Sequence, residues 1–278
     1  MKSGQYEIDL TVSPDVAWNA VIAGGRRDWY YRLTPDVDLV EGAHIRWQSP
    51  GGSVAEESDV VEVVAPRRLV MKTRYVFVPN LAAEEPHKLE WEVLPSGSGS
   101  RVSLKWEAGD VVGAVFQPEA ESMLLGLRLA VDPEAQGEIA RLESIGPLEI
   151  RDLTPERLDD YLQFFDHDAF RDYPAWRSCY CMETHRTISD EEWATRTAEE
   201  NRRDMVELIK QGKVTSLLAY EDGKPVGWCN YGPTTTLDGV MRRFKLEAPE
   251  HRGVGSVACF VIAAPYRGHG IASRLLDT

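Results

Sequence analysis

The stretch Cys259–Thr278, CFVIAAPYRGHGIASRLLDT, decides how the second half of this 278-residue chain folds. It predicts a buried apolar strand, then a tight turn with two glycines, then the first turns of a helix. In the turn, residues 267–272 read RGHGIA, and its glycines let the backbone approach a ligand without a Cβ in the way. Amide groups at the start of a helix point outward and favour anions, so this turn is suited to a diphosphate group.

Two common phosphate-binding loops do not fit this turn. It lacks the Lys-Ser/Thr pair of a Walker loop, so a nucleoside triphosphate with magnesium is not expected. It also follows a helix-rich segment and a hairpin, which is the wrong context for a dinucleotide fingerprint. The remaining alternative is a plain strand-to-helix turn whose glycines only serve the backbone.

The segments upstream of the turn predict a mixed domain. Gly146-Pro147 marks its start, and a short strand follows before a helix that begins after Thr154. A capping box of Ser189 with Glu192 predicts one long helix that ends at Gly212. Strands on either side of Asp222-Gly223 predict a hairpin that precedes the strand at 256–263.

The pattern Arg/Gln-x-x-Gly-x-Gly/Ala fits Arg267, Gly270 and Ala272, and it resembles motif A of the GNAT acetyltransferases. The order of elements over residues 147–278 and the segment EDGKPVGW are similar to that family as well. The resemblance implies acetyl-CoA or another acyl-CoA as donor, and no metal. It also implies a set of co-substrate-binding residues, the first three acting through their backbone: Phe260, Val261, Ile262, Arg267, Gly268, His269, Gly270, Ile271 and Ala272.

The later strands of that family, and the Tyr that protonates the leaving thiolate in many of its members, have no counterpart before Thr278. We therefore expect an incomplete or truncated chain with very low acetyltransferase activity. An exposed strand edge would also favour dimerisation or aggregation.

The irregular segment CYCMETH, residues 179–185, holds the candidate general base. Glu183 is the residue we assign to this role, with His185 as a second candidate, while surface residues without a role are the alternative reading. Cys179, Cys181 and His185 form half of a zinc motif, but packing in the core or in a substrate loop explains them better, so we expect no metal site.

The first half alternates apolar and polar residues in several strands, starting with YEIDLTV at 6–12, and ends in helical sequence over much of 118–143 that Pro133 should interrupt. Stretches such as VSPDVAWNAVI and HKLEWEVLPSGSGSRVSLKWE resemble the START-like (SRPBCC) superfamily, in the branch related to activators of the Hsp90 ATPase. The resemblance implies a helix-grip fold, an antiparallel sheet around one long helix. Four tryptophans either line a cavity for an apolar ligand or simply pack the core: Trp29, Trp47, Trp91 and Trp106.

Composition limits the partners. The net charge is −14 and no long basic run occurs, which disfavours nucleic acids and anionic membrane surfaces. The start of the sequence has no apolar signal-peptide core and only four cysteines occur, so the cytoplasm is the expected location.

The sequence thus predicts an α+β helix-grip domain at residues 1–146 and an incomplete α/β GNAT domain with a mixed sheet at 147–278. We expect an acyl-CoA-dependent N-acetyltransferase that modifies a primary amine on a small molecule or peptide. The main alternative is a non-catalytic protein that binds a hydrophobic ligand and CoA, and a chaperone-cofactor role ranks third.

Overall fold

The computed structural model describes residues 1–77, 79–193 and 195–278. The chain forms two units, Met1–Glu138 and Ile139–Thr278, each with its own buried apolar cluster.

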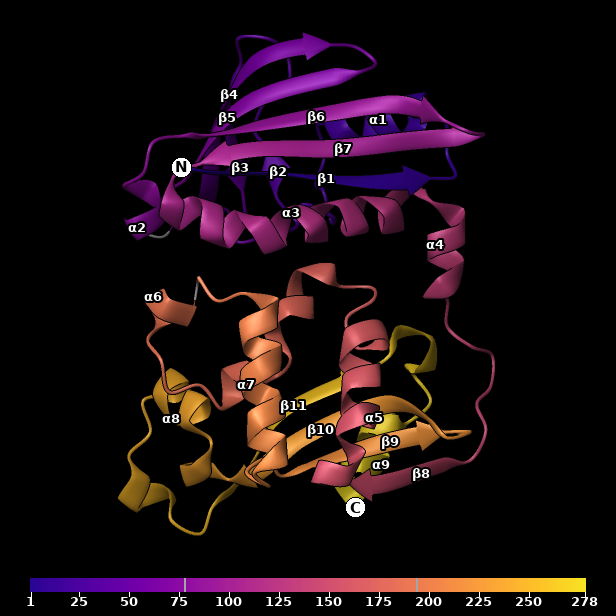
Figure 1. Ribbon diagram of the computed structural model, residues 1–278, viewed down its shortest axis with the longest axis vertical. Coiled ribbons are helices and arrows are strands. Elements are labelled where there is room, and N and C mark those ends of the chain that lie inside the picture. The colour runs from indigo at the N-terminus through magenta and orange to yellow at the C-terminus, as the bar shows by residue number, and fades with distance from the viewer. Residues whose placement is uncertain (78, 194) are drawn as a thin grey trace. The chain divides into compact units, whose positions relative to one another are not determined.

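The first unit contains a seven-stranded antiparallel sheet in the order β1-β7-β6-β5-β4-β3-β2 (Figure 1). In β1 the side chains alternate between the sheet's two faces, as the pattern of YEIDLTV predicts. The strands are β1 (Lys2–Leu10), β2 (Thr34–Pro35), β3 (His44–Gln48), β4 (Val54–Val64), β5 (Arg68–Tyr75), β6 (His87–Ser96) and β7 (Gly99–Ala108).

A long helix, α3 (Asp110–Val131), contacts β1 and β7, so the helix-grip prediction is confirmed (Figure 1). The predicted start at residue 118 is wrong, because α3 begins directly after β7, at Asp110. Asp132 then ends α3, and its Oδ1 accepts a hydrogen bond from the amide of Glu134 at 3.0 Å. Pro133 starts α4, since it has no N–H to donate within a continuing helix. The unit's helices are α1 (Pro14–Ile22), α2 (Pro79–Ala82), α3 and α4 (Pro133–Glu138).

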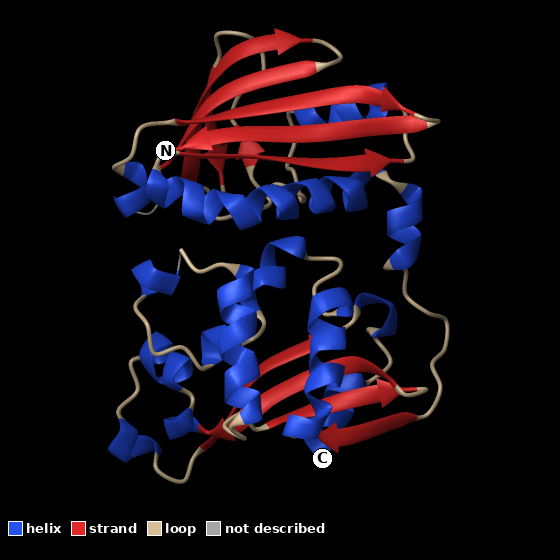
Figure 2. Cartoon of the chain, viewed as in Figure 1, coloured by secondary structure: helices blue, strands red, loops and turns tan. Residues whose placement is uncertain are grey.

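The second unit contains a four-stranded antiparallel sheet in the order β11-β10-β9-β8, which Figure 2 draws in red. Its central hairpin turns at Asp222 and Gly223, both with positive φ, as the sequence predicts. β11 is an edge strand, and its register with β10 shifts between Asn230 and Tyr231, which leaves Ala258 as an extra residue. The strands are β8 (Leu148–Asp152), β9 (Ser216–Glu221), β10 (Lys224–Pro233) and β11 (Gly255–Ile262).

The helices of the second unit differ from the prediction at one place. The segment after Ser189 is not one long helix, because a short helix ends at Trp193 and a new one begins at Ala198. Thr197 caps the second helix in a full capping box with Glu200, so this cap, rather than that of Ser189, starts the long helix. The α-helices are α5 (Leu158–Gln163), α6 (Asp190–Trp193), α7 (Ala198–Lys210), α8 (Asp238–Phe244) and α9 (Ile271–Asp277).

Short 3-10 turns and one π-helical turn complete the second unit. The π-helical turn, Phe164–Asp168, extends α5. The 3-10 turns are Pro155–Arg157, Pro174–Cys179, Met182–Thr184, Thr234–Thr236, Ala248–His251 and Ala264–Tyr266. In the part of the chain that the structure describes, no helix combines the length and the apolar character needed to cross a membrane.

Candidate functional site

The strand, turn and helix predicted from the sequence are present at the end of the second unit. β11 leads through a 3-10 turn, Ala264–Tyr266, to the loop that precedes α9. Gly268 and Gly270 have φ of +79° and +76°, in the left-handed region where a Cβ is unfavourable. The loop conformation therefore depends on glycine at both positions.

This loop borders a groove of about 540 Å³. Eight of the nine predicted co-substrate residues line it: Phe260, Val261, Ile262, Arg267, Gly268, Gly270, Ile271 and Ala272. The remaining lining comes from residues that the sequence patterns did not single out: Phe170, Asp172, Tyr173, Trp176, Tyr266 and Ser273. The local motif thus meets an aromatic segment from earlier in the chain.

His269 is the ninth predicted residue, and it is not among the described residues that line the groove. Its Nε2 lies 3.0 Å from the carbonyl oxygen of Leu142. The side chain therefore faces the segment before β8, and only its backbone stays next to the groove.

Arg267 connects the loop to the aromatic segment. Its guanidinium forms a bidentate ion pair with Asp172, and its Nε donates to the carbonyl oxygen of Ile262 at 2.9 Å. Beside this pair, the rings of Tyr173 and Trp176 lie 4.9 Å apart, and the Trp176 side chain is 62% exposed. The two rings are tilted by 58°, so the exposed face of Trp176 alone is the surface available to a planar group.

Arg141 supplies a positive charge on the other side of the loop. Its Nη2 donates to the carbonyl oxygen of Gly268 at 3.2 Å, and a Cβ on Gly268 would come within 2.9 Å of its guanidinium carbon. Because Arg267 is paired with Asp172, Arg141 is the better placed of these two arginines to neutralise an anionic group in the loop.

The predicted base Glu183 lies in the short 3-10 turn Met182–Thr184. Its Oε1 is 3.8 Å from Arg186 Nε and 3.7 Å from Arg243 Nη1, so two guanidinium groups flank the carboxylate. α8 packs closely on this turn: a Cβ on Gly239 would come within 1.8 Å of the Glu183 carbonyl oxygen. Glu183 therefore lies where α8 packs on this turn.

His185 is less suited to proton transfer. Asn230 on β10 donates from Nδ2 to His185 Nε2 at 2.8 Å, so the imidazole proton lies on Nδ1. Burial lowers the pKa of His185 to about 4. The imidazole is then neutral near pH 7, with its basic nitrogen already engaged.

Two cysteines meet beside this cluster. Cys181 Sγ donates to Cys259 Sγ at 3.1 Å, and this bond raises the pKa of Cys181 and lowers that of Cys259. The contact joins the irregular segment to β11, next to Phe260. Within the described ranges, no group of three or more His, Cys, Asp or Glu side chains is arranged to hold a metal ion.

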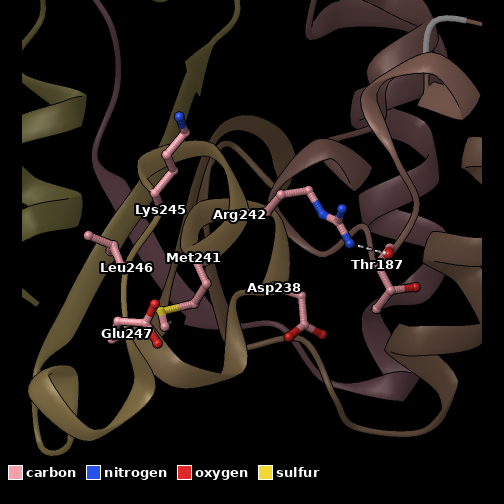
Figure 3. Close-up of a pocket in the computed structure, with 7 residues that line it drawn as sticks. All are labelled: Thr187, Asp238, Met241, Arg242, Lys245, Leu246 and Glu247. Atoms are coloured by element: carbon pink, nitrogen blue, oxygen red, sulfur yellow. Dashed lines mark hydrogen bonds between the residues drawn. The ribbon is translucent and has the colours of Figure 1, made fainter.

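A second pocket of about 420 Å³ lies between α8 and the segment at Thr187 (Figure 3). Arg242 closes one side by donating from Nη2 to the Thr187 carbonyl oxygen at 2.7 Å. Asp238 and Glu247 supply carboxylates to its lining, and Asp238 is close enough to His185 to affect its charge. The pocket lining therefore combines two carboxylates with two cationic side chains, Arg242 and Lys245.

The four tryptophans predicted as cavity candidates lie in or against the core of the first unit. Trp47, Trp91 and Trp106 are almost fully buried, and Trp29 packs edge-on against Trp91 with ring centroids 5.6 Å apart. This packing fits the core reading, and their role in a ligand cavity stays a prediction.

Comparisons with known proteins agree with this division of the chain. The model of the acetyltransferase (GNAT) family matches residues 158–278, and that of the activator of Hsp90 ATPase homolog 1-like proteins matches residues 11–124. The chain thus carries one domain of each family, in the order that the sequence resemblances predict.

Several solved structures are similar to the first part of the chain at low identity. Protein MLL2253 from Mesorhizobium loti is 11% identical, with a TM-score of 0.40, over 46% of this chain and 94% of its own. CalU16 from Micromonospora echinospora is 19% identical, with a TM-score of 0.38, over 49% of this chain and 79% of its own. The Aha1 dimer from Colwellia psychrerythraea is 13% identical, with a TM-score of 0.39, over 48% of this chain and 98% of its own. Such likenesses support no statement about function, and no curated protein matches the chain.

Proposed function

We propose that the second unit is an N-acyltransferase that moves an acetyl or related acyl group from CoA to a primary amine. The observation that carries this proposal is the groove along β11, because an edge strand, a glycine loop and an arginine meet there.

The groove fits the parts of an acyl-CoA in order. One side of β11 has no strand partner among the described residues, so the backbone at 260–262 is available to the amide groups of the pantetheine arm. Gly268 and Gly270 allow close approach of the diphosphate, which Arg141 neutralises. The exposed ring of Trp176 offers a surface for the adenine.

The reaction needs a proton acceptor and a donor to the oxyanion. The amine nitrogen attacks the thioester carbonyl carbon, the C–S bond breaks, the nitrogen loses a proton and the sulfur leaves as a thiolate that gains one. We assign the acceptance of the amine proton to Glu183, directly or through a water. The bulge at Ala258 interrupts the β10–β11 ladder, and an amide freed there is suited to donate to the oxyanion.

The acceptor amine would enter from the pocket of Figure 3. Asp238 and Glu247 lie in its lining beside Arg242 and Lys245, so a cationic amine would find carboxylate partners there. α8, which lines this pocket, packs on the turn that carries Glu183, so we expect the amine to approach this carboxylate from the pocket.

The test is acyl transfer by the full chain. The chain is incubated for hours with acetyl-CoA and a panel of primary amines, and mass spectrometry detects acetylated amine together with free CoA. We expect product from the wild-type chain and none from Gly270→Glu, which fills the loop. Binding of acetyl-CoA without any product would instead favour a non-catalytic CoA-binding protein. If the chain neither binds acetyl-CoA nor forms product, the proposal is contradicted.

A further inference from the structure

The interior of the first unit contains two carboxyl groups in a largely apolar core. Glu56 on β4 is 2% exposed, and it accepts a hydrogen bond at 2.5 Å from the hydroxyl of Tyr30. Glu119 on α3 accepts one at 2.6 Å from the hydroxyl of Tyr75 on β5. The long helix and the sheet therefore each direct an acid into the core between them.

These acids are costly to bury. Burial raises the pKa of Glu56 to about 8, with repulsion from Glu119 adding to the effect, and it raises the pKa of Glu119 to about 7. Arg27 is a buried cation of the same unit, but it donates to the Ala23 carbonyl oxygen at 2.8 Å and lies over the Trp47 ring. Neither acid has an ion-pair partner that the described residues show, so each holds its proton up to near neutral pH.

Tyr31 and His87 place two further polar atoms in this region. Among the described residues, neither Tyr31 Oη nor His87 Nδ1 has a hydrogen-bond partner, although both atoms are buried. Tyr31 is close enough to Glu56 and Glu119 for both to raise its pKa, after the larger effect of burial. His87 is 2% exposed, stacks on Tyr75 at 5.1 Å, and burial lowers its pKa to about 4. Neither atom has a protein partner among the described residues, and a bound molecule with polar groups would supply one.

Aromatic rings surround the acids. Tyr30 meets Trp47 edge-on with centroids 5.0 Å apart, and Phe116 lies 5.3 Å from His87. The faces of such rings attract cations, while their area suits an apolar body. Carboxyl groups beside these rings would disfavour an anion by charge, and a purely apolar molecule would leave Tyr31 and His87 without partners.

We propose that the interior of the first unit binds an organic ammonium ion, with its nitrogen at Glu56 and Glu119 and its apolar body against the aromatic rings. The ammonium N–H groups donate to carboxylate oxygens, and the proton held by one carboxyl leaves for solvent on binding. Tyr31 and His87 supply further polar contacts to the bound molecule. The proposal does not depend on acyl transfer, since every residue in it lies in the first unit.

Calorimetric titration tests the proposal with matched probes. Ethylammonium, 2-phenylethylammonium and tryptammonium are titrated into the full chain at pH 7.5, beside the neutral 2-phenylethanol. We expect at least one ammonium to bind roughly tenfold or more tightly than the alcohol. Titrations in two buffers of different ionisation enthalpy should show release of close to one proton. Affinity should fall as the pH drops below 7, because protons then compete for both carboxyls.

Variants separate the site from general effects on folding. Glu56→Gln and Glu119→Gln should each weaken ammonium binding roughly tenfold or more, while the neighbouring Glu57→Gln, on the other face of β4, should not. Both core variants should remain folded, since an amide is cheaper to bury than a carboxylate. Equal binding of ammonium and alcohol, binding unaffected by both core variants, or no binding of any ammonium probe would overturn the proposal.

Discussion

The two units hold their ionisable groups in opposite ways. In the first unit, Glu56 and Glu119 lie between a helix and a sheet, and their pKa values are raised by the loss of solvent. In the second, Arg141 and Arg267 lie at a solvent-open loop, where hydrogen bonds fix their positions. An interior of the first kind recognises a small molecule by enclosing it, whereas an open groove admits part of a long one. The comparison therefore predicts that the two units bind different ligands, and that a substitution in the site of one unit abolishes binding of that unit's ligand alone.

The largest effect should come from the core of the first unit. Trp47→Ala removes a fully buried side chain and its 2.9 Å hydrogen bond to Ser58, and it should destabilise that unit by about 3–5 kcal/mol. Urea unfolding followed by circular dichroism measures the loss. If the units fold separately, the affinity for acetyl-CoA should not change. A parallel loss of acetyl-CoA binding would contradict the separation of the two units.

Glu183→Gln should slow acyl transfer by roughly a hundredfold while the affinity for acetyl-CoA stays the same, because a general base acts after the donor binds. Single-turnover measurements give the rate, and calorimetry gives the affinity. Glu199→Gln, on the exposed surface of α7, is the control and should transfer at the wild-type rate. An unchanged rate in Glu183→Gln would assign the proton transfer to another group.

Glu56→Gln should make the first unit more stable at high pH. The folded pKa of about 8 exceeds the ordinary 4.5, so between these values the unfolded chain releases a proton that the folded chain keeps, and stability falls as pH rises. The glutamine variant lacks this loss and should gain about 4 kcal/mol at pH 8 but only about 1 kcal/mol at pH 5. Urea titrations at both pH values measure the difference. A stability difference between variant and wild type that does not depend on pH would mean that Glu56 is ionised in the folded state.

The smallest effect concerns the loop. Arg141→Ala should weaken acetyl-CoA binding by about tenfold, since one charge-assisted contact to an anionic group is lost. Dephospho-CoA and pantetheine serve as comparison ligands. Pantetheine, which has no diphosphate, should bind both proteins equally, and an equal loss for pantetheine would place the role of Arg141 elsewhere.

The sequence predicted most strands and the order of elements in both units, because local patterns of residues determine them. Alternation identified β1 and β6, and the Asp222-Gly223 pair identified the hairpin. The helix errors arose where two local signals compete. Ser189 and Thr197 each have a Glu three residues later, and only the structure shows that Thr197 starts the long helix.

The candidate sites were predictable only where they are continuous in sequence. The loop at 267–272 carries its own glycine signal, whereas Asp172 lines the groove and Arg141 bonds to the loop from segments with no motif. Glu56 and Glu57 are adjacent glutamates, and which one faces the core depends on the register of β4 with its neighbours. Tertiary contacts, rather than residue type, select these positions.

Titration of acetyl-CoA into the full chain tests the central claim most directly, with Gly270→Glu and Gly223→Glu as a matched pair. Both glycines have a φ of +76° and open space where a Cβ would lie, but only Gly270 borders the groove. We predict binding by the wild-type chain and by Gly223→Glu, and none by Gly270→Glu. Equal affinity in all three proteins, or no binding by the wild-type chain, would contradict the assignment of the groove to acyl-CoA.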